Sequence, residues 1–225
     1  MFRIRHILAI IVTLCAAGAL YWHIFVRPRS HHFDVDRTEY PVKGIDLSAH
    51  NGVVDFDSVA ADSVEFVYLK ATEGIDFCDS RFDANFRAAR DAGLKVGAYH
   101  YFRFNTDGAR QAEHFMATIG DRDPDLPLAI DVEIYGNAAS HDDAAVVNEL
   151  AAMIEMLEHH GWRVMIYTNK NGYRRFVEDK FTTVDLWICS LSGVPDEGLP
   201  WNYWQHSHRG RVRGINGDVD LNTLR

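Results

Sequence analysis

The chain has 225 residues, of which 47% are hydrophobic and 12% aromatic, and its formal net charge is −9 at pH 7. This composition supplies a full hydrophobic core and excludes an intrinsically disordered protein. The first 33 residues contain four arginines and no acidic residue, so the remaining 19 basic and 32 acidic residues carry a charge of −13. Because binding to nucleic-acid phosphates needs a positive face, we expect no nucleic-acid partner.

The N-terminus resembles a membrane or export signal. Residues 1–6 are basic, and residues 7–26 (ILAIIVTLCAAGALYWHIFV) are almost wholly apolar. Twenty residues at about 1.5 Å each span a hydrocarbon core about 30 Å thick, which favours an uncleaved transmembrane anchor. Small residues within the segment leave cleavage as a signal peptide open. Residues 27–41 are expected to be a tether, and residues 42–225 a domain facing the periplasm or cell exterior, or secreted.

From residue 43 onward, strand-like and helix-like segments alternate. The expected strands are 43–50, 65–72, 95–102, 126–133, 163–169, 184–191, 201–207 and 217–224. The expected helices are 56–63, 80–93, 107–120, 140–161 and 171–179. In the clearest helix, 140–161, Ser140 is the expected N-cap and Gly161 the stop. Its expected apolar stripe is Val147, Leu150, Ile154 and Leu157.

Five strand–helix units followed by three strands predict an α/β fold with a mostly parallel sheet. Eight such strands can close into a TIM-barrel-like (β/α)5(β)3 barrel, and in these barrels the active site lies at the C-terminal ends of the strands. This rule brings the following side chains to one mouth: Asp46, Tyr99, His100, Tyr101, Asp131, Glu133, Tyr167, Asn169, Trp187, Trp204, Gln205, Asp218 and Asp220. Carboxylates and aromatic rings converge there, and no lysine or arginine cluster joins them.

The segment LPLAIDVEIYG, residues 126–136, places Asp131 and Glu133 two positions apart, and therefore on one face of a strand. Glycoside hydrolysis typically uses one protonated carboxylic acid and a second carboxylate. Glu133 is the expected general acid, and we expect burial and repulsion from Asp131 to raise its pKa. The aromatic rings would supply flat platforms for sugars. A D-x-E pattern alone is a weak signal of catalysis, and it is the convergence at the strand ends that makes the signal specific.

The sequence predicts no cofactor and no metal. It has no H-E-x-x-H motif and no Cys/His cluster, although His206 and His208 could form half of a metal site. Cys78 and Cys189 could pair in an exported protein, but two cysteines far apart in sequence favour unpaired thiols.

Eight segments resemble glycoside hydrolase family 25, the lysozyme-type muramidases of bacteria, phages and fungi. They are KGIDLSAHNG, EFVYLKATEG, KVGAYHYF, LAIDVE, VMIYTN, LWICS, WQHS and GDVDLNTL, in the order that the family shows. The resemblance covers about residues 42–225, and it is specific because the opening D-x-S, the central D-x-E and the closing D-L-N occur together. It implies a barrel of five β/α units followed by three strands. It also implies cleavage of the β-1,4 bond between N-acetylmuramic acid and N-acetylglucosamine in peptidoglycan glycan strands.

The resemblance also implies roles for single residues. Glu133 would protonate the leaving oxygen, and Asp131 would assist as a base or by orienting the substrate N-acetyl group. Asp46 and Asp220 would line the site. Substrate contacts would come from the tyrosines, tryptophans and glutamine of the mouth: Tyr99, Tyr101, Tyr167, Trp187, Trp204 and Gln205. Whether a carboxylate or the acetamido group attacks the anomeric carbon stays open.

Departures from the family pattern are Asn51, Cys189 and His206, which put substrate detail in question and leave the acids intact. Two alternatives remain: a glycosidase acting on another N-acetylated glycan such as chitin, and a non-catalytic wall-binding module. Chitinases carry a longer run of alternating aspartates, whereas the position two before Asp131 is Ala129. Retention of every expected acid argues against the binding module. We expect a monomer.

Overall fold

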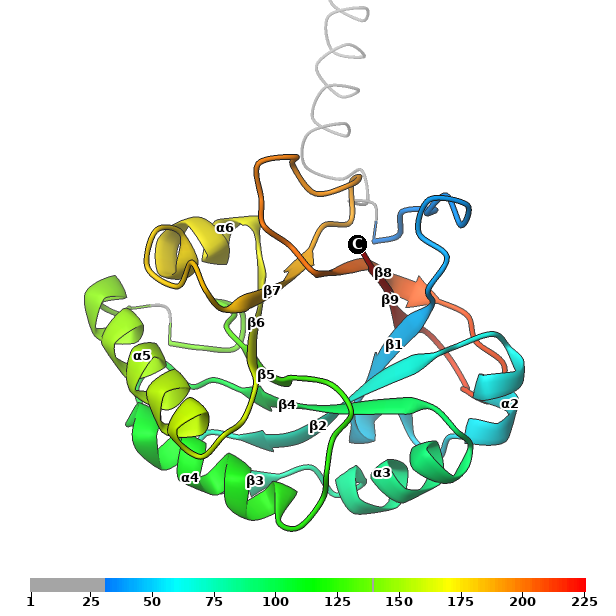
Figure 1. Ribbon diagram of the computed structural model, residues 1–225, viewed down its shortest axis with the longest axis horizontal. Helices are drawn as coiled ribbons and strands as arrows, with labels where there is room; N and C mark the ends of the chain where they lie inside the picture. The colour runs from blue at the N-terminus through cyan, green and yellow to red at the C-terminus, as the bar shows by residue number, and fades with distance from the viewer. Residues whose placement is uncertain (1–30, 139) are drawn as a thin grey trace, which may run out of the picture. The chain divides into compact units, whose positions relative to one another are not determined.

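A computed structural model of the chain describes residues 31–138 and 140–225. The predicted anchor, residues 7–26, and its basic flank lie outside these described residues. Among the helices of the described part, none is long and apolar enough to cross a membrane. Residues 31–225 form one unit, in which helices cover part of the outer side of a ring of strands (Figure 1).

Within the described residues, eight strands close into a barrel. They are β1 (Gly44–Leu47), β2 (Phe66–Glu73), β4 (Lys95–Tyr101), β5 (Leu128–Asp131), β6 (Val164–Asn169), β7 (Asp185–Cys189), β8 (Tyr203–Gly210) and β9 (Val219–Leu224). A two-residue strand, β3 (Phe77–Cys78), pairs with the end of β2. Neighbours from β1 to β8 run parallel, whereas β9 is antiparallel to both β8 and β1 and closes the ring. The predicted barrel is therefore confirmed.

Helices follow the first five strands of the barrel. They are η2 (Ala49–Asn51) with α2 (Phe56–Ala61), then α3 (Phe82–Asp91), α4 (Gly108–Ile119), α5 (Asp143–His159) and α6 (Lys170–Gly172), the last of which continues as one wide helical turn, η3 (Tyr173–Val177). The predicted order of five strand–helix units and three further strands is thus observed.

Helix α5 begins later than expected. Asp142, not Ser140, is the N-cap, because its carboxylate accepts a hydrogen bond from the backbone N of Ala144 at 3.0 Å. The buried face of the helix consists of Val146, Leu150, Met153, Ile154 and Leu157, while the expected Val147 is only half-buried. The apolar stripe is therefore rotated slightly from the predicted one.

Aromatic rings fill the interior of the barrel. Trp187 lies at a ring-centroid distance of 4.8 Å from Tyr68 and 4.7 Å from Tyr167. Glycine makes room for these rings, because a Cβ at Gly97 would lie 2.3 Å from the ring of Tyr68. Phe66, Ala129 and Met165 complete this inner cluster. The interior is therefore a packed core, as in other barrels of this type, and its upper rings form a floor beneath the mouth.

Residues 31–41 pack against the outer face of β7 and β8, where no helix covers the strands in the described part of the chain. The backbone N of Phe33 donates to the carbonyl of His206 at 2.8 Å. Tyr40 is buried, and its ring lies edge-on to Trp204 at 5.7 Å. The sequence predicted a tether up to residue 41, whereas the described part of that stretch takes the place of the missing helices.

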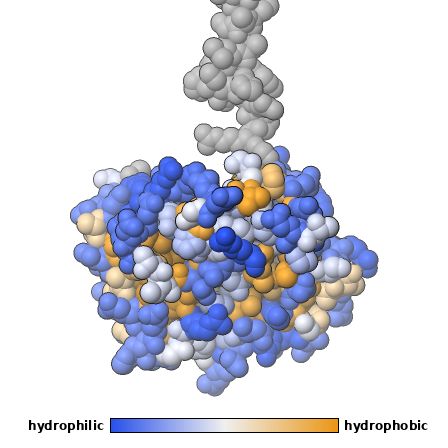
Figure 2. Space-filling view, turned by 45° about the horizontal axis from the view of Figure 1, so that its top comes forward, coloured by the Kyte–Doolittle hydropathy of each residue, from blue (hydrophilic) through white to orange (hydrophobic). Residues whose placement is uncertain are grey.

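The face drawn in Figure 2 is mostly hydrophilic, with apolar residues in scattered patches between the polar ones. In the described residues, the large hydrophobic side chains that are exposed are Val53, Phe77, Tyr135 and Val194.

Candidate active site

A cleft of about 390 Å³ opens at the mouth of the barrel, where the parallel strands end. Its walls are formed by Asp46, His50, Tyr99, Tyr101, Asp131, Glu133, Tyr135, Tyr167, Trp187, Gln205, His208 and Asp220. Asp220 reaches this mouth for a different reason from the others. Because β9 runs antiparallel, it is the beginning of β9 that lies beside the end of β1, and Asp220 pairs in register with Asp46.

Asp131 and Glu133 reach the cleft from the end of β5. The strand ends at Asp131, and Glu133 lies two residues further along the chain. Between them, Val132 is fully buried on the opposite side, and its backbone N donates to the carbonyl of Tyr167 at 2.9 Å. The alternation that begins in the strand therefore continues for two more residues and brings both carboxyl groups to the same cavity.

Asp131 is a buried carboxyl group with an unused oxygen. Its Oδ1 is shielded from solvent and has no hydrogen-bond partner among the described residues. Burial raises the pKa of Asp131 well above its ordinary value, and the negative charges of Glu133 and Asp46 add to this effect. A buried acceptor without a partner is costly, so this oxygen is poised to accept a hydrogen bond from a bound molecule.

Glu133 has the protonation behaviour of a general acid. Burial raises its pKa to about 7, and the negative charge of Asp46 contributes to the shift. The structure corrects the prediction that Asp131 helps to raise the pKa of Glu133. Burial raises the pKa of Asp131 as well and favours its uncharged form, which does not repel a carboxylate. Asp46, on the other side of the cleft, supplies the charge.

Asp46 is the carboxyl group that the site stabilises as an anion. Its Oδ2 accepts hydrogen bonds from Gln205 Nε2 at 2.9 Å and from Asn222 Nδ2 at 2.8 Å. Burial raises the pKa of Asp46 above its ordinary value, and these two bonds together with one from Asp220 limit the rise by stabilising the anion. Burial and the charges of Asp46 and Glu133 raise the pKa of Asp220 to about 9, so Asp220 is protonated at neutral pH and donates to Asp46.

The amides beside Asp46 are held in one orientation by their other contacts. Tyr167 Oη donates to Gln205 Oε1 at 2.7 Å, so the Gln205 amide nitrogen must face the acids. In the same way, Trp187 Nε1 donates to Asn222 Oδ1 at 2.9 Å and turns the Asn222 amide nitrogen toward Asp46. The aromatic floor therefore orients the donors that stabilise the Asp46 anion.

The structure separates the predicted contact residues into two groups. Tyr99, Tyr101, Tyr167, Trp187 and Gln205 line the cleft. Trp204 does not: it is fully buried on the outer face of β8, where its Nε1 donates to the carbonyl of Ser190 at 2.8 Å.

Three other residues named at the strand ends also lie away from the cleft walls. His100 is fully buried on the outer side of β4 between Thr72 and Gln111. The side chain of Asn169 caps helix α6.

Asp218 pairs with Arg211 at the surface, at 2.8 Å.

Three residues of the cleft walls were not predicted from the sequence. His50 lies three residues beyond the end of β1, and Tyr135 lies two residues beyond Glu133, so the rule of strand ends could have found both. His208 could not be found this way. The pairing of β8 with β9 shifts register around Ser207, so His208 joins Gln205 on the cleft side while His206 faces outward to Phe33.

The two strand histidines therefore do not form half of a metal site. His206 Nδ1 lies 2.8 Å from the carbonyl of Phe33, and His208 Nε2 lies 2.8 Å from Gln205 Oε1, on opposite sides of the strand. In residues 31–138 and 140–225, no group of three or more His, Cys, Asp or Glu side chains is arranged to hold a metal ion.

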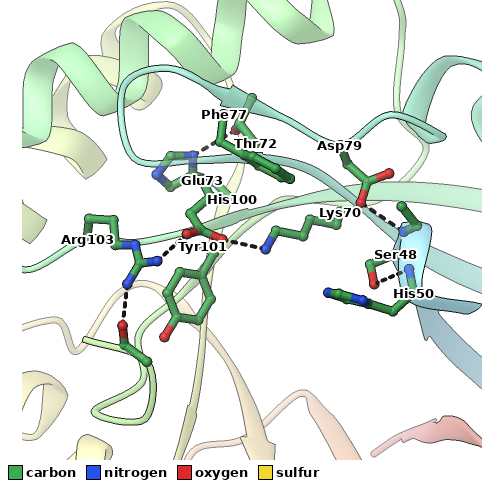
Figure 3. Close-up of polar contacts among 12 residues, drawn as sticks. Ser48, His50, Lys70, Thr72, Glu73, Phe77, Asp79, His100, Tyr101 and Arg103 are labelled. Atoms are coloured by element: carbon green, nitrogen blue, oxygen red, sulfur yellow. Dashed lines mark hydrogen bonds and ion pairs between the residues drawn. The ribbon is translucent and has the colours of Figure 1, made fainter.

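Two cations lie beside the cleft, although no lysine or arginine cluster was predicted at the mouth. Lys70 Nζ pairs with Glu73 Oε2 at 2.7 Å, and Arg103 pairs with the other oxygen of Glu73 (Figure 3). Both cations also contact the ring of Tyr101, each at 5.1 Å from its centroid. This cluster fixes Tyr101 and partly offsets the cleft's acidity, because the charge of Lys70 lowers the pKa of Asp131.

Within residues 31–138 and 140–225, Cys78 and Cys189 form no disulfide. Cys189 lies near the cleft, with its Sγ at 3.7 Å from His208 Nε2. Burial raises the pKa of Cys189 to about 12. Since only a thiolate is an effective nucleophile, Cys189 is an inert thiol at neutral pH.

Known proteins share this fold and these motifs. A family model described as "Glycosyl hydrolases family 25" matches residues 45–215. The "Autolytic lysozyme" of Clostridium acetobutylicum is 37% identical over 182 residues, which cover 80% of this chain and 55% of that protein. "Lysozyme M1" of Streptomyces globisporus is 33% identical, with 80% of this chain and 67% of that protein covered.

Among solved structures, a family 25 glycosyl hydrolase from Bacillus anthracis superposes with a TM-score of 0.78 at 32% sequence identity. The match covers 88% of this chain and 94% of that one. By contrast, the chain spans about half the length of the clostridial relative.

Proposed function

This chain belongs to glycosyl hydrolase family 25, and from that premise we propose that it is a muramidase. It would cleave the β-1,4 bond between N-acetylmuramic acid and N-acetylglucosamine in peptidoglycan. The observation that carries the proposal is one cavity that holds a carboxylic acid with a pKa of about 7, Glu133, next to Asp131 with its unpartnered oxygen. Two relatives named as lysozymes support the same activity.

In this mechanism Glu133 donates its proton to the glycosidic oxygen as the bond to the anomeric carbon breaks. Its raised pKa keeps a large fraction of the acid protonated near neutral pH. In the second step the resulting carboxylate takes a proton from the water that releases the product, and Glu133 returns to its acid form.

Asp131 orients the substrate. Its buried, unpartnered Oδ1 is suited to accept a hydrogen bond from the N–H of the N-acetyl group. The acetamido oxygen would then face the anomeric carbon and attack it as the glycosidic bond breaks, giving a cyclic oxazolinium ion that water opens.

Asp46 supplies negative charge opposite the positive charge that develops at the anomeric carbon. A fixed anion held by two oriented amides needs no rearrangement when the charge appears, which is how preorganised sites lower a barrier. Asp220, protonated, keeps Asp46 in place from the neighbouring strand.

The experiment that tests the activity is mass spectrometry of the products released from purified peptidoglycan. Wild type should yield fragments with reducing-end N-acetylmuramic acid, and Glu133→Gln should lose this activity by roughly 100-fold or more. Glu158→Gln, on the exposed surface of α5, is the matched control and should keep wild-type activity. Undiminished product from Glu133→Gln would refute the assignment, as would reducing-end N-acetylglucosamine.

We also propose that the domain acts outside the cytoplasm and is held to the membrane by residues 7–26. Twenty almost wholly apolar residues after a basic flank support it. The expected result is recovery in the membrane fraction, with the domain accessible to protease added outside the cytoplasm. Recovery in the soluble cytoplasmic fraction would contradict it.

A further inference from the structure

Tyr135 is the exposed aromatic side chain of the cleft. It is 88% exposed, and of the large exposed hydrophobic residues in the described part of the chain it alone lines the cleft. Single exposed hydrophobic residues are common on protein surfaces, so exposure by itself carries no argument. What distinguishes Tyr135 is the way in which the backbone that carries it is held.

The backbone around Tyr135 is anchored on both sides. Tyr101 Oη donates to the carbonyl of Tyr135, and Arg103 Nη1 donates to the carbonyl of Gly136. One residue further, Asn137 Nδ2 donates to the carbonyl of Glu133 at 2.8 Å. Three carbonyls of this exposed loop are thus bound by side chains, two from the end of β4 and one from the loop itself, which makes the loop a rigid support.

The donors that hold the loop are themselves fixed. The ring of Tyr101 is in contact with both Lys70 and Arg103, which share Glu73 as their ion-pair partner. Figure 3 shows these side chains converging at the ends of β2 and β4. The loop also depends on glycine, because Gly136 has a φ of +81° and a Cβ there would lie 2.6 Å from Tyr101 Oη.

We propose that Tyr135 is a sugar-stacking platform at the rim of the cleft, which binds a saccharide of the glycan strand outside the pair that flanks the scissile bond. The apolar face of a pyranose ring packs on an aromatic ring, and a ring on a rigid support loses little freedom when it binds. The inference rests on the proposed function, and it adds a residue that selects long strands over short fragments.

The test compares Tyr135→Ala and Tyr135→Phe on two substrates, long peptidoglycan glycan strands and a fragment only two sugars long. On long strands, Tyr135→Ala should raise KM about ten-fold with kcat within about two-fold of wild type, while Tyr135→Phe keeps the wild-type KM. On the short fragment neither variant should change KM. Val53→Ala, at a side chain that is 75% exposed and outside the cleft walls, is the matched control.

An unchanged KM for Tyr135→Ala on long strands would overturn the proposal. So would a fall in kcat at constant KM, because Tyr135 would then act by holding Glu133. A separate measurement keeps the two proposals apart: co-sedimentation of strands with Glu133→Gln and with the Glu133→Gln, Tyr135→Ala double variant. Weaker binding of the double variant supports the platform even if wild type shows no hydrolysis, and equal binding refutes it.

Discussion

Asp46 on β1 and Asp220 on β9 are paired in register across two antiparallel strands, and the amide nitrogen of Gln205 donates to both of them, at 2.9 and 3.3 Å. Two carboxyl groups this close cannot both ionise easily. Asp220 keeps the proton, because its pKa is raised to about 9, and Asp46 is stabilised as the anion by the amides around it. The charge of Asp46 then raises the pKa of Glu133 from across the cleft.

The first prediction is the pH dependence of the wild-type enzyme. Glu133 must be protonated to act as the acid, and its pKa is about 7, so kcat/KM should fall about ten-fold per pH unit above that value. At low pH the rate should fall again as Asp46 gains a proton. Initial rates of reducing-end release between pH 4 and 10 measure both limbs. A rate that stays constant up to pH 9 would contradict the assignment of Glu133.

The second prediction concerns the source of the Glu133 shift. Asp46→Asn removes a negative charge that disfavours ionisation of Glu133, so the alkaline limb should move to lower pH, by up to about one unit. The maximal rate should also fall, by about 10-fold or more, because charge opposite the anomeric carbon is lost. Asp218→Asn is the control, since Asp218 pairs with Arg211 at the surface. An alkaline limb that does not move would show that burial alone sets the pKa.

The third prediction links the site to stability. Folding raises the pKa of Glu133 from 4.5 to about 7, so the folded state binds more protons than the unfolded state over that range. The contribution of Glu133 to the free energy of unfolding is therefore most favourable below pH 4.5 and is lost as pH rises through 7. Glu133→Gln carries no such charge, and at pH 8 it should be more stable than wild type by roughly 1–3 kcal/mol.

Urea unfolding at pH 5 and pH 8 measures this difference. Burial is the largest cause of the raised pKa values of Asp131 and Asp220 and acts in both proteins, whereas the part of each shift that comes from the charge of Glu133 belongs to the measured difference. Identical pH dependence in wild type and Glu133→Gln would show that Glu133 is not held in its neutral form by the fold.

Local periodicity was enough to predict which side chains of a strand share the cleft. Asp131 and Glu133 are two residues apart, as are Tyr99 and Tyr101, and all four line the cavity. The same alternation explains why Trp204, a predicted substrate contact, does not line the cleft. Adjacent residues of a strand point to opposite faces, so Trp204 and Gln205 could not both line the cleft.

Relationships between distant segments could not be predicted in this way. The bulge that turns His208 toward the cleft depends on how β8 pairs with β9. The packing of Tyr40 on Trp204 joins residues 164 positions apart, and no local pattern in residues 31–41 predicts it. The cause of the Glu133 shift was attributed to the nearest acid in sequence, whereas the charge comes from Asp46 on another strand.

The fourth prediction concerns Asn137, which holds the loop that carries Glu133. Its Nδ2 donates to the carbonyls of Glu133 at 2.8 Å and Phe102 at 3.0 Å, and its Oδ1 accepts from the backbone N of Phe104 at 3.0 Å. One side chain thus joins the segment after β5 to the segment after β4. Asn137→Ala should lower the free energy of unfolding by about 2 kcal/mol, because three backbone groups lose their partner.

The same change should act on catalysis by displacing the acid. We expect Asn137→Ala to lower kcat by about 10-fold or more with little change in KM, since a small misplacement of a proton donor affects the transition state more than substrate binding. Asn105→Ala, at an exposed asparagine of the preceding loop, is the matched control. Rates must be measured well below the melting temperature of each variant. A wild-type kcat for folded Asn137→Ala would mean that Val132, anchored to Tyr167, is sufficient to hold Glu133 in place.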